Sequence, residues 1–414
     1  MVHQLKTVLP NEFILSEPFH GVGSFYYLCR QAEQASQGSV HVSLVNAYEF
    51  DKRFLKFYKE RDAKDSCNPR QACLSITEDF TKFPMHVFED SDFLVAGAPC
   101  QFVANNGKGL GEEDPRAKCF KQVIQLVIHL GRQGRLKGFA LENSPNIMKR
   151  INGANATFAD KCIKKLNGKL SDWEFDVVKV DANPLPHHRP RAFIRGQRRD
   201  TMRWLSIEAP LQEIVNYWGD VLRVGLIDVL DPDLPHVDLD TLTDKRKKNV
   251  KDYMKAIGDL KKTKLLKHTH ACFEVDRAFT GVYASTIYWD CTPPLRVKGP
   301  DTFVLSVGTR SEAVGERTAR FLSEGERFLV AGQKDYSTYV SVGKMFGRQM
   351  NGNAYPSTMV FKACFPMLQD MALAKVEAGL KRALETESTD SPQPAPKRRC
   401  VTREWKLKKR DSGV

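Results

Sequence analysis

The chain has 414 residues, of which 42% are hydrophobic and 27% charged, enough to bury a sizeable core in two or three compact units. No run approaches the roughly 18–20 uninterrupted apolar residues that cross a bilayer, and no charged segment with a following apolar run opens the sequence. We therefore expect a soluble intracellular protein. Its formal net charge of +13 favours a polyanionic partner, although a basic enzyme without such a partner has the same balance.

From residue 13 to about 196, apolar strand-like runs alternate with amphipathic segments of helical period. The runs are FILSEPFHGVG, VHVSLVNAYEF, SDFLVAGAPC, LKGFALEN, EFDVVKVDA and RAFIRG. This alternation predicts a parallel α/β sheet, and ligands of such sheets bind at the carboxyl ends of the strands.

The loop PFHGVGSF follows the first of these runs. Gly21 and Gly23 allow its backbone to approach a ligand at a helix N-terminus, although a plain tight turn uses the same residues. The next run ends in Glu49, about 26 residues after Gly23, near the position where an acidic side chain meets ribose hydroxyls in dinucleotide-binding folds. Phe50, beside it, has a ring that can stack on adenine.

Ten cysteines are scattered along the chain without a Cys-x-x-Cys pair or histidines at zinc-binding spacing, so neither a disulfide framework nor a metal site is expected. Cys100 differs from the others because it ends the apolar run SDFLVAGAPCQ, just before the Gly-, Asn- and Lys-rich segment FVANNGKGLGEEDPR. A cysteine in this setting is expected to expose its thiol, whereas most cysteines are buried packing residues.

The alternation fades between about 200 and 310, where residues 244–270 contain ten Lys or Arg against three Asp. This stretch is either a solvated helix face or a phosphate-contacting surface of a separate recognition region, and the charge of the whole chain favours the second.

Order resumes near 313 and ends in the amphipathic stretch MLQDMALAKVEAGLKRALE. Residues 386–414 are predicted to be a disordered tail, whose basic clusters at 397–399 and 406–410 resemble a bipartite nuclear-import signal. We expect a nuclear protein, with an untargeted basic tail as the alternative.

The segments around Gly21, Glu49 and Cys100, with five more, stand in the order typical of cytosine-5 DNA methyltransferases, which the chain resembles over most of residues 13–370. The five others are Asp114-Pro115-Arg116, FALEN ending in Glu142 and Asn143, LPHHRPRAFIRG with Arg189 and Arg191, RFLSEGERF, and Gly352-Asn353-Ala354. The resemblance implies a Rossmann-like class I S-adenosylmethionine-dependent methyltransferase fold, with a mixed seven-stranded sheet and a smaller target-recognition domain.

By that resemblance, residues 1–200 form the first part of the catalytic cofactor-binding domain and 201–312 the target-recognition region. Residues 313–385 return to complete the catalytic domain, and 386–414 are the tail. S-adenosylmethionine is the implied cofactor. The residues implied to bind it are Phe19, Gly21, Gly23, Glu49, Phe50, Ile76, Asn353 and Ala354.

The same resemblance implies the chemistry. Cys100 adds to C6 of cytosine and makes C5 nucleophilic toward the methyl sulfonium. Glu142 hydrogen-bonds or protonates N3, and Arg191, helped by Arg189, holds the O2 edge. A cytosine inside a duplex is unreachable, so the base is flipped from double-stranded DNA while the loop Asn105–Gly111 closes over it.

The sequence departs from the family pattern at four places. His187 stands where the family has Gln, Ser75 where it usually has the Asp that binds the adenine amino group, and Ser24 where it has a second glycine. RFLSEGERFLVAG keeps Arg320 and Glu326 but loses other positions. These departures leave the nucleophile, the carboxyl group and the arginine in place, and are expected to weaken cofactor binding or to change the target.

Two other functions remain open. One branch of the family performs the same chemistry on transfer RNA, and DRAFTGVYAS resembles a Cys-Phe-Thr motif of that branch, with Ala278 at the Cys position. A catalytically silent nucleic-acid-binding scaffold is the second alternative, but a scaffold does not need a thiol opposite a carboxyl group. The long basic segment and the tail favour DNA over transfer RNA.

Overall fold

The computed structural model describes residues 1–19, 21, 23–44, 47–48, 51, 53–54, 74–75, 80, 85–103, 111–150, 155–182, 185–202, 226–262, 268–281, 286–295, 301–307, 319–332 and 356–389. The chain divides into two compact units, residues 1–374 and 375–414, and the features below lie in the first, except for the end of the long C-terminal helix. Within the described part of the chain, no helix is both long and apolar enough to cross a membrane.

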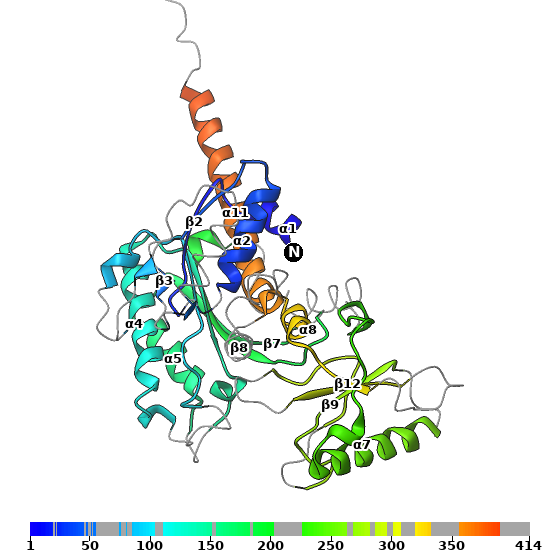
Figure 1. The fold of residues 1–414 in the computed structure, drawn as a ribbon. Coiled ribbons are helices and arrows are strands. Elements are labelled where there is room, and N and C mark those ends of the chain that lie inside the picture. The colour runs from blue at the N-terminus through cyan, green and yellow to red at the C-terminus, as the bar shows by residue number, and fades with distance from the viewer. Residues whose placement is uncertain are drawn as a thin grey trace, which may run out of the picture. The chain divides into compact units, whose positions relative to one another are not determined.

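A six-stranded sheet forms the larger core (Figure 1), with strand order β2-β1-β5-β6-β8-β7. The strands are β1 (Glu12–Ser16), β2 (His41–Leu44), β5 (Phe93–Ala96), β6 (Gly138–Asn143), β7 (Trp173–Val180) and β8 (Arg191–Arg198). β2, β1, β5 and β6 run parallel, whereas β8 is antiparallel to both β6 and β7. The connection at 181–190 is too short for a crossover helix, so β7 and β8 pair antiparallel. The sheet is therefore mixed, as the family resemblance implied.

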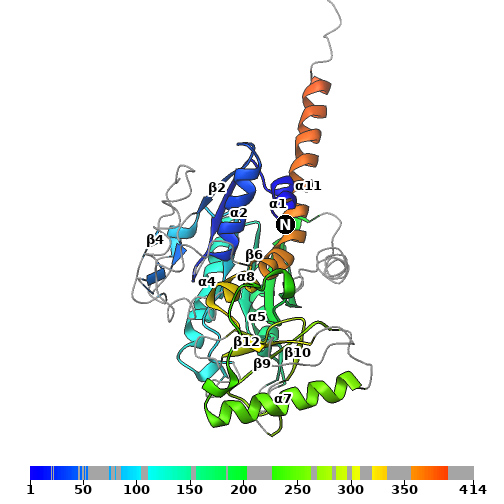
Figure 2. The ribbon, with the colours of Figure 1, turned by 45° about the vertical axis from the view of Figure 1, so that its right-hand side comes forward.

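A seventh strand does not join this sheet within the described residues. Instead, β3 (Ala47–Tyr48) and β4 (Leu74–Ser75) form a separate parallel pair. β3 follows β2 closely in the sequence, but its described pairing is with β4 and not with the strands of the larger sheet. Figure 2 shows β4 on the side of β2.

Helices cover both faces of the sheet (Figures 1 and 2). α4 (Ala117–Gln133) and α5 (Phe158–Asn167) pack on one face, whereas α1 (Val2–Val8), α2 (Ser24–Ala35) and the first turns of α11 (Ser357–Thr389) pack on the other. α4 buries apolar residues at helical spacing and ends at Gly134, which has a φ of 77°. Because both faces are covered, all six residues of β6 are buried.

A smaller lobe is built on a second sheet of strand order β10-β9-β11-β12. Its strands are β9 (His270–Glu274), β10 (Tyr288–Trp289), β11 (Thr302–Ser306) and β12 (Ala319–Phe321). α7 (Asp244–Lys262) packs on it through Val250, Tyr253 and Ile257, and the Tyr253 ring stacks on Phe273 at 4.1 Å between centroids. The lobe extends beyond the predicted boundary at 312, because β12 pairs with β11.

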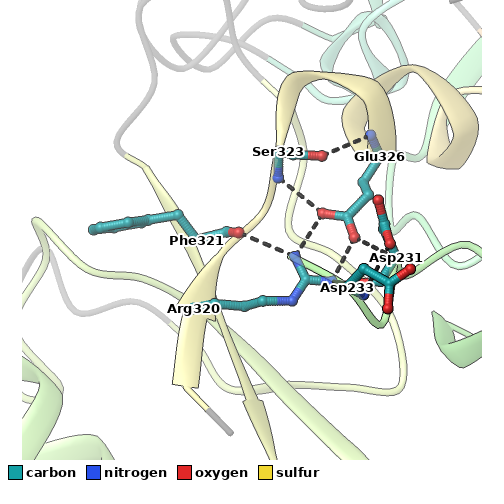
Figure 3. Close-up of polar contacts among 6 residues, drawn as sticks. All are labelled: Asp231, Asp233, Arg320, Phe321, Ser323 and Glu326. Carbon is teal, nitrogen blue, oxygen red and sulfur yellow. Dashed lines mark hydrogen bonds and ion pairs between the residues drawn. The ribbon is translucent and has the colours of Figure 1, made fainter. Parts of the chain in front are cut away.

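A buried ion pair fixes the exit from this lobe (Figure 3). α8 (Glu324–Val330) begins with a capping box in which Ser323 and Glu326 each bind the other's backbone N–H. The same Glu326 carboxylate accepts a 2.8 Å hydrogen bond from Arg320 Nη1 and a 2.7 Å bond from the backbone N–H of Asp231. Arg320 and Glu326, which the sequence shares with the family motif, thus join β12, α8 and the segment at 231.

The remaining short helices are η2 (Met85–Phe88), η3 (Gly111–Glu113), η4 (Pro145–Met148), η5 (Arg199–Thr201), η6 (Leu226–Asp228) and η7 (Leu239–Thr241). α11 returns to the sheet and binds the turn after β7, where Thr358 Oγ1 donates to the Ala182 carbonyl at 2.9 Å and Lys362 Nζ donates to the Asp181 carbonyl at 3.3 Å. The helix continues to Thr389, past the predicted start of the tail at 386. The rest of the tail lies outside the described residues.

Candidate active site

The ends of three neighbouring strands bring the predicted catalytic residues to one edge of the sheet. β5 and β6 are parallel, with Ala96 opposite Leu141, so Cys100 after β5 and Glu142 in β6 lie at the same edge. β8 is antiparallel to β6, with Ala192 opposite Asn143, so Arg191 at the start of β8 reaches this edge too. Strand register alone thus gathers a thiol, a carboxyl group and a guanidinium.

Glu142 and Arg191 form an ion pair, with 2.6 Å between Oε1 and Nε. Glu142 is only 8% exposed. Burial raises the pKa of this carboxyl group above its usual range, against the opposing effect of Arg191 and Arg189. The site therefore favours the protonated carboxyl group more than water does, and a protonated carboxyl group can donate a hydrogen bond.

Cys100 is half-buried and lies within electrostatic range of the other predicted catalytic residues. Burial, and then the charge of Glu142, raises the pKa of the Cys100 thiol, whereas Arg191 and Arg189 lower it. Because burial prevails, the thiol is protonated in the resting site at neutral pH. Its two neighbouring guanidiniums favour the thiolate once a proton acceptor is present.

Two asparagines hold the loop that carries Cys100. Asn143 Nδ2 donates to the Ala98 carbonyl at 3.3 Å, and Asn146 Nδ2 donates to the Val103 carbonyl at 2.9 Å, so the loop is bound on both sides of the cysteine. Asn143 belongs to the motif noted in the sequence. Asn146 was missed, and its only local signal is the Ser144-Pro145 start of η4, where Ser144 is the N-cap.

Arg116 is a further cation that acts on Cys100. Its Nε donates to Asp114 Oδ1 at 2.8 Å, and the buried Asp114 raises the pKa of Arg116 through this bond. A smaller contribution comes from Cys100 itself, which places the two side chains within electrostatic range. The Asp-Pro-Arg motif thus forms an internal ion pair beside the thiol. The predicted closing loop lies between this motif and the cysteine. Residues 104–110, which include most of that loop, lie outside the described residues.

Arg189 is buried and binds the backbone of the smaller lobe. Its Nη1 donates to the Leu295 carbonyl at 2.8 Å, and its backbone N–H donates to Asp181 Oδ1 at 2.8 Å. Burial, and then the neighbouring Arg191, lowers the pKa of Arg189 to about 9, whereas Glu142 and Cys100 raise it. Asp181 and Leu295 were not found by sequence reasoning, because neither belongs to a local motif.

The loop after β1 has the backbone conformation of a ligand cradle. Phe19, Gly21 and Gly23 all have positive φ, at 58°, 54° and 63°, directly before the N-terminus of α2. The Phe19 ring packs on Phe80 with 4.5 Å between centroids. The buried Ser24, in the place of a second glycine, is the first residue of α2. These described residues fit a small ligand with an anionic group, such as the carboxylate of an amino acid.

The other predicted cofactor residues lie outside the described part of the chain. They are Glu49, Phe50, Ile76, Asn353 and Ala354. Ser75 is the second residue of β4. The structure therefore brings together the four predicted catalytic residues and the first cofactor loop, and leaves the rest of the cofactor set as predictions.

The sequence matches the C-5 cytosine-specific DNA methylase family over residues 15–362. It is similar to the type II methyltransferase M1.ScrFI of Lactococcus lactis subsp. cremoris, with 27% identity over 202 residues, which cover 47% of this chain and 45% of that protein. It is also similar to M.HaeII of Haemophilus aegyptius, with 32% identity over 111 residues, which cover 26% of this chain and 31% of that protein. The chain thus spans less than half the length of these curated relatives.

Solved structures show the same fold at low sequence identity. The Dnmt2 methyltransferase of S. pombe has a TM-score of 0.53 and 11% identity, and the alignment covers 86% of this chain and 98% of that one. A mutant of DNMT2 from Spodoptera frugiperda has a TM-score of 0.51 and 14% identity, covering 86% and 99%. The α/β class I methyltransferase fold expected from the resemblance is therefore confirmed.

The nuclear location predicted from the basic tail is wrong. The relatives include type II methyltransferases of Lactococcus lactis, Neisseria gonorrhoeae and Haemophilus aegyptius, which are bacteria and have no nucleus. Clusters of Lys and Arg in a polar tail are not specific to nuclear import, because the same composition makes any tail soluble and attractive to polyanions.

Proposed function

Because the chain belongs to the C-5 cytosine-specific DNA methylase family, we propose that it transfers a methyl group from S-adenosylmethionine to C5 of cytosine in double-stranded DNA. One observation carries this proposal: a thiol, a buried carboxyl group and a guanidinium meet at the carboxyl edge of the sheet, with Glu142 and Arg191 2.6 Å apart. Family membership alone identifies a reaction, and this convergence supplies the groups that the reaction needs.

In the proposed reaction, the Cys100 thiolate attacks C6 of the cytosine and forms an S–C6 bond. The electrons of the C5–C6 double bond become available at C5, which would form the new bond to the methyl carbon as the bond from that carbon to the sulfonium sulfur breaks. Glu142 donates its proton toward N3 as negative charge develops there, and its raised pKa favours the form that can donate. Loss of the C5 proton to solvent, return of the N3 proton to Glu142 and cleavage of the S–C6 bond then release the product and restore the Cys100 thiolate.

Arg191 has two tasks in this scheme. Its ion pair with Glu142 holds the carboxyl group in place, and its guanidinium supplies donors for the O2 edge of the ring, where charge also develops. Arg189, bound to the Leu295 carbonyl, contributes further positive charge to the site. The proposed site thus places a proton donor, Glu142, and two cations, Arg189 and Arg191, around the cytosine ring beside Cys100.

S-adenosylmethionine, when bound, supplies an electrophilic methyl group. The Phe19–Gly23 loop and the N-terminus of α2 are proposed to hold its amino acid part, since Phe19, Gly21 and Gly23 all have positive φ and lead into a helix N-terminus, which favours an anionic group. Glu49, Phe50, Ile76, Asn353 and Ala354 are proposed to hold the ribose and adenine. These five assignments rest on the family motifs.

The lobe of α7 and the second sheet is proposed as the target-recognition region, and the target base as one flipped out of the duplex. Support comes from the outer side of α7, where Lys245, Lys248, Lys251 and Lys255 are exposed at helical spacing opposite the buried Val250, Tyr253 and Ile257. A row of lysines contacts phosphates of either nucleic acid, so the choice of DNA over transfer RNA rests on the family and not on this helix.

The test is a covalent trap. Duplex DNA with 5-fluorocytosine, incubated with S-adenosylmethionine, is expected to stay joined to the wild-type protein, because fluorine at C5 cannot leave as a proton. Cys100→Ser should give no adduct, whereas Cys119→Ser, which alters another partly exposed cysteine, should trap like the wild type. A parallel filter assay with tritiated cofactor, duplex DNA and transfer RNA separates the substrates. Labelling of transfer RNA alone, or no labelling at all, would contradict the proposal.

A further inference from the structure

A short proline-containing segment of the smaller lobe is bound along the strand that leads to the catalytic arginines. Within Thr292–Leu295, Pro293 and Pro294 have no N–H, so the segment has two amide donors. Both are used by the facing strand: Thr292 N–H donates to the Pro186 carbonyl at 2.8 Å, and Leu295 N–H donates to His187 Nε2 at 3.2 Å. The docking of this segment is therefore fixed at both ends.

The carbonyls at the two ends of the segment are bound in the same way. His188 N–H donates to the Thr292 carbonyl at 3.0 Å, and Arg189 Nη1 donates to the Leu295 carbonyl at 2.8 Å. His187 and Arg189 are two apart in an extended stretch, so both side chains point to the same side. Together they bind the N–H and the C=O of one residue, Leu295.

His187 is held in its neutral form by this arrangement. The ring is 1% exposed, and its Nε2 accepts from Leu295, so the ring hydrogen belongs on Nδ1. The charged groups that face it are Arg189 and Arg191 on its own strand, the adjacent His188, and Arg327 from α8. Burial first, and then these cations, lower the pKa of His187 well below its usual value.

We infer that His187 is a positioning residue that, with Arg189, clasps the Leu295 backbone and makes the placement of the catalytic arginines depend on the seating of the lobe segment Thr292–Leu295. The inference rests on the proposed methyl transfer at Cys100. It assigns a task to the histidine that stands in place of the family's glutamine. A glutamine has an acceptor oxygen too, but only the histidine loses its acceptor on protonation.

The test uses two substitutions at His187 in the full chain. His187→Gln keeps an acceptor for Leu295 N–H, whereas His187→Leu fills similar space without one. His129→Leu, on α4 and remote from the clasp, serves as the matched control. Steady-state methylation of duplex DNA is measured for each variant. Hydrogen exchange is measured for the peptide that contains Thr292–Leu295, and within these four residues only Thr292 and Leu295 carry a backbone N–H.

His187→Leu is expected to lower kcat about tenfold, the effect of one lost buried hydrogen bond, while the KM for the cofactor stays within about twofold. It should also speed exchange of the Thr292–Leu295 amides. His187→Gln should restore both values, and its rate should follow that of the wild type from neutral to mildly acidic pH, because burial keeps the wild-type His187 neutral there. His129→Leu should match the wild type throughout.

Two outcomes would overturn the inference. One is wild-type exchange of the Thr292–Leu295 amides in His187→Leu, and the other is an equal loss of activity in the glutamine and leucine variants. An inactive wild type defeats the proposed function instead. The exchange measurement still reports on the clasp in that case, so the two failures can be told apart.

Discussion

Glu142→Gln is expected to remove most of the activity and yet to stabilise the folded protein above acidic pH. Glutamine has nearly the shape of the carboxyl group, so the cavity around it is preserved, but it has no proton to transfer to N3. Positioned acid catalysis contributes about 10²–10⁴-fold to rate, and we expect the methylation rate to fall within that range. The Cys100 adduct with 5-fluorocytosine should form correspondingly more slowly.

The stability effect follows from the direction in which the pKa of Glu142 is moved. Burial raises this pKa in the folded protein above the value in the unfolded chain, even with Arg191 2.6 Å away. The folded state is therefore penalised as pH rises through this range, by about 1.4 kcal/mol for each pH unit that separates the two pKa values. The uncharged glutamine of the variant avoids the penalty. Stability of the variant relative to the wild type should thus be higher at pH 8 than at pH 4.

Urea unfolding of both proteins at several pH values measures this difference, and single-turnover methylation measures the rate. Glu142→Asp serves as a second variant that keeps an acid but moves it away from Arg191. Two results would refute the reasoning. One is a stability difference between the glutamine variant and the wild type that does not change with pH, and the other is a methylation rate of the glutamine variant within about tenfold of the wild type.

Three further substitutions test the fold and the cofactor loop. Glu326→Ala leaves the buried Arg320 without its carboxylate and should destabilise the protein by about 3–5 kcal/mol in urea unfolding; a change below about 1 kcal/mol would mean that the pair does not anchor β12 to α8. Gly196→Ala places a Cβ against the Phe139 ring, 2.6 Å from its Cζ, and should destabilise by about 1–3 kcal/mol in the same assay, with wild-type stability as the contrary result. Gly21→Ala, at φ +54°, should weaken S-adenosylmethionine binding about tenfold in calorimetry, and an unchanged Kd would exclude this loop from the cofactor site.

The main sheet was predictable because its strands carry their signal locally. Each of the six apolar runs forms a strand, and the carboxyl ends of neighbouring strands had to meet, so Cys100 and Glu142 could be placed together from the sequence. The antiparallel direction of β8 was not contained in the periodicity, which is the same for both directions, and the family resemblance implied only that the sheet is mixed. β12 lies past the predicted lobe boundary at 312, and its three residues give almost no pattern in the sequence.

The supports of the site were missed for a different reason. Asp181 accepts from the backbone N–H of Arg189, Asn146 donates to the Val103 carbonyl, and Leu295 acts through its own carbonyl, which accepts from the Arg189 side chain. A backbone partner leaves no mark in the sequence, since every residue offers the same N–H and C=O. His187 was noticed as a departure from the family, but its partner, the Leu295 amide, could only be found in the structure.

The ionisation states of the residues in the site favour a negatively charged substrate. Burial raises the pKa of both acids, Cys100 and Glu142, so both favour their neutral forms, while Arg189, with a pKa of about 9, stays mainly charged at neutral pH. These ionisation states give the site an excess of positive charge. In the proposed reaction, the phosphates of a DNA strand offset this charge, and addition of the thiolate sends negative charge toward N3 and O2, where a protonated Glu142 and the Arg191 guanidinium would receive it. After burial, the same excess of positive charge opposes protonation of His187. It also favours the proposed substrate and adduct, so a neutral imidazole at the clasp is compatible with catalysis.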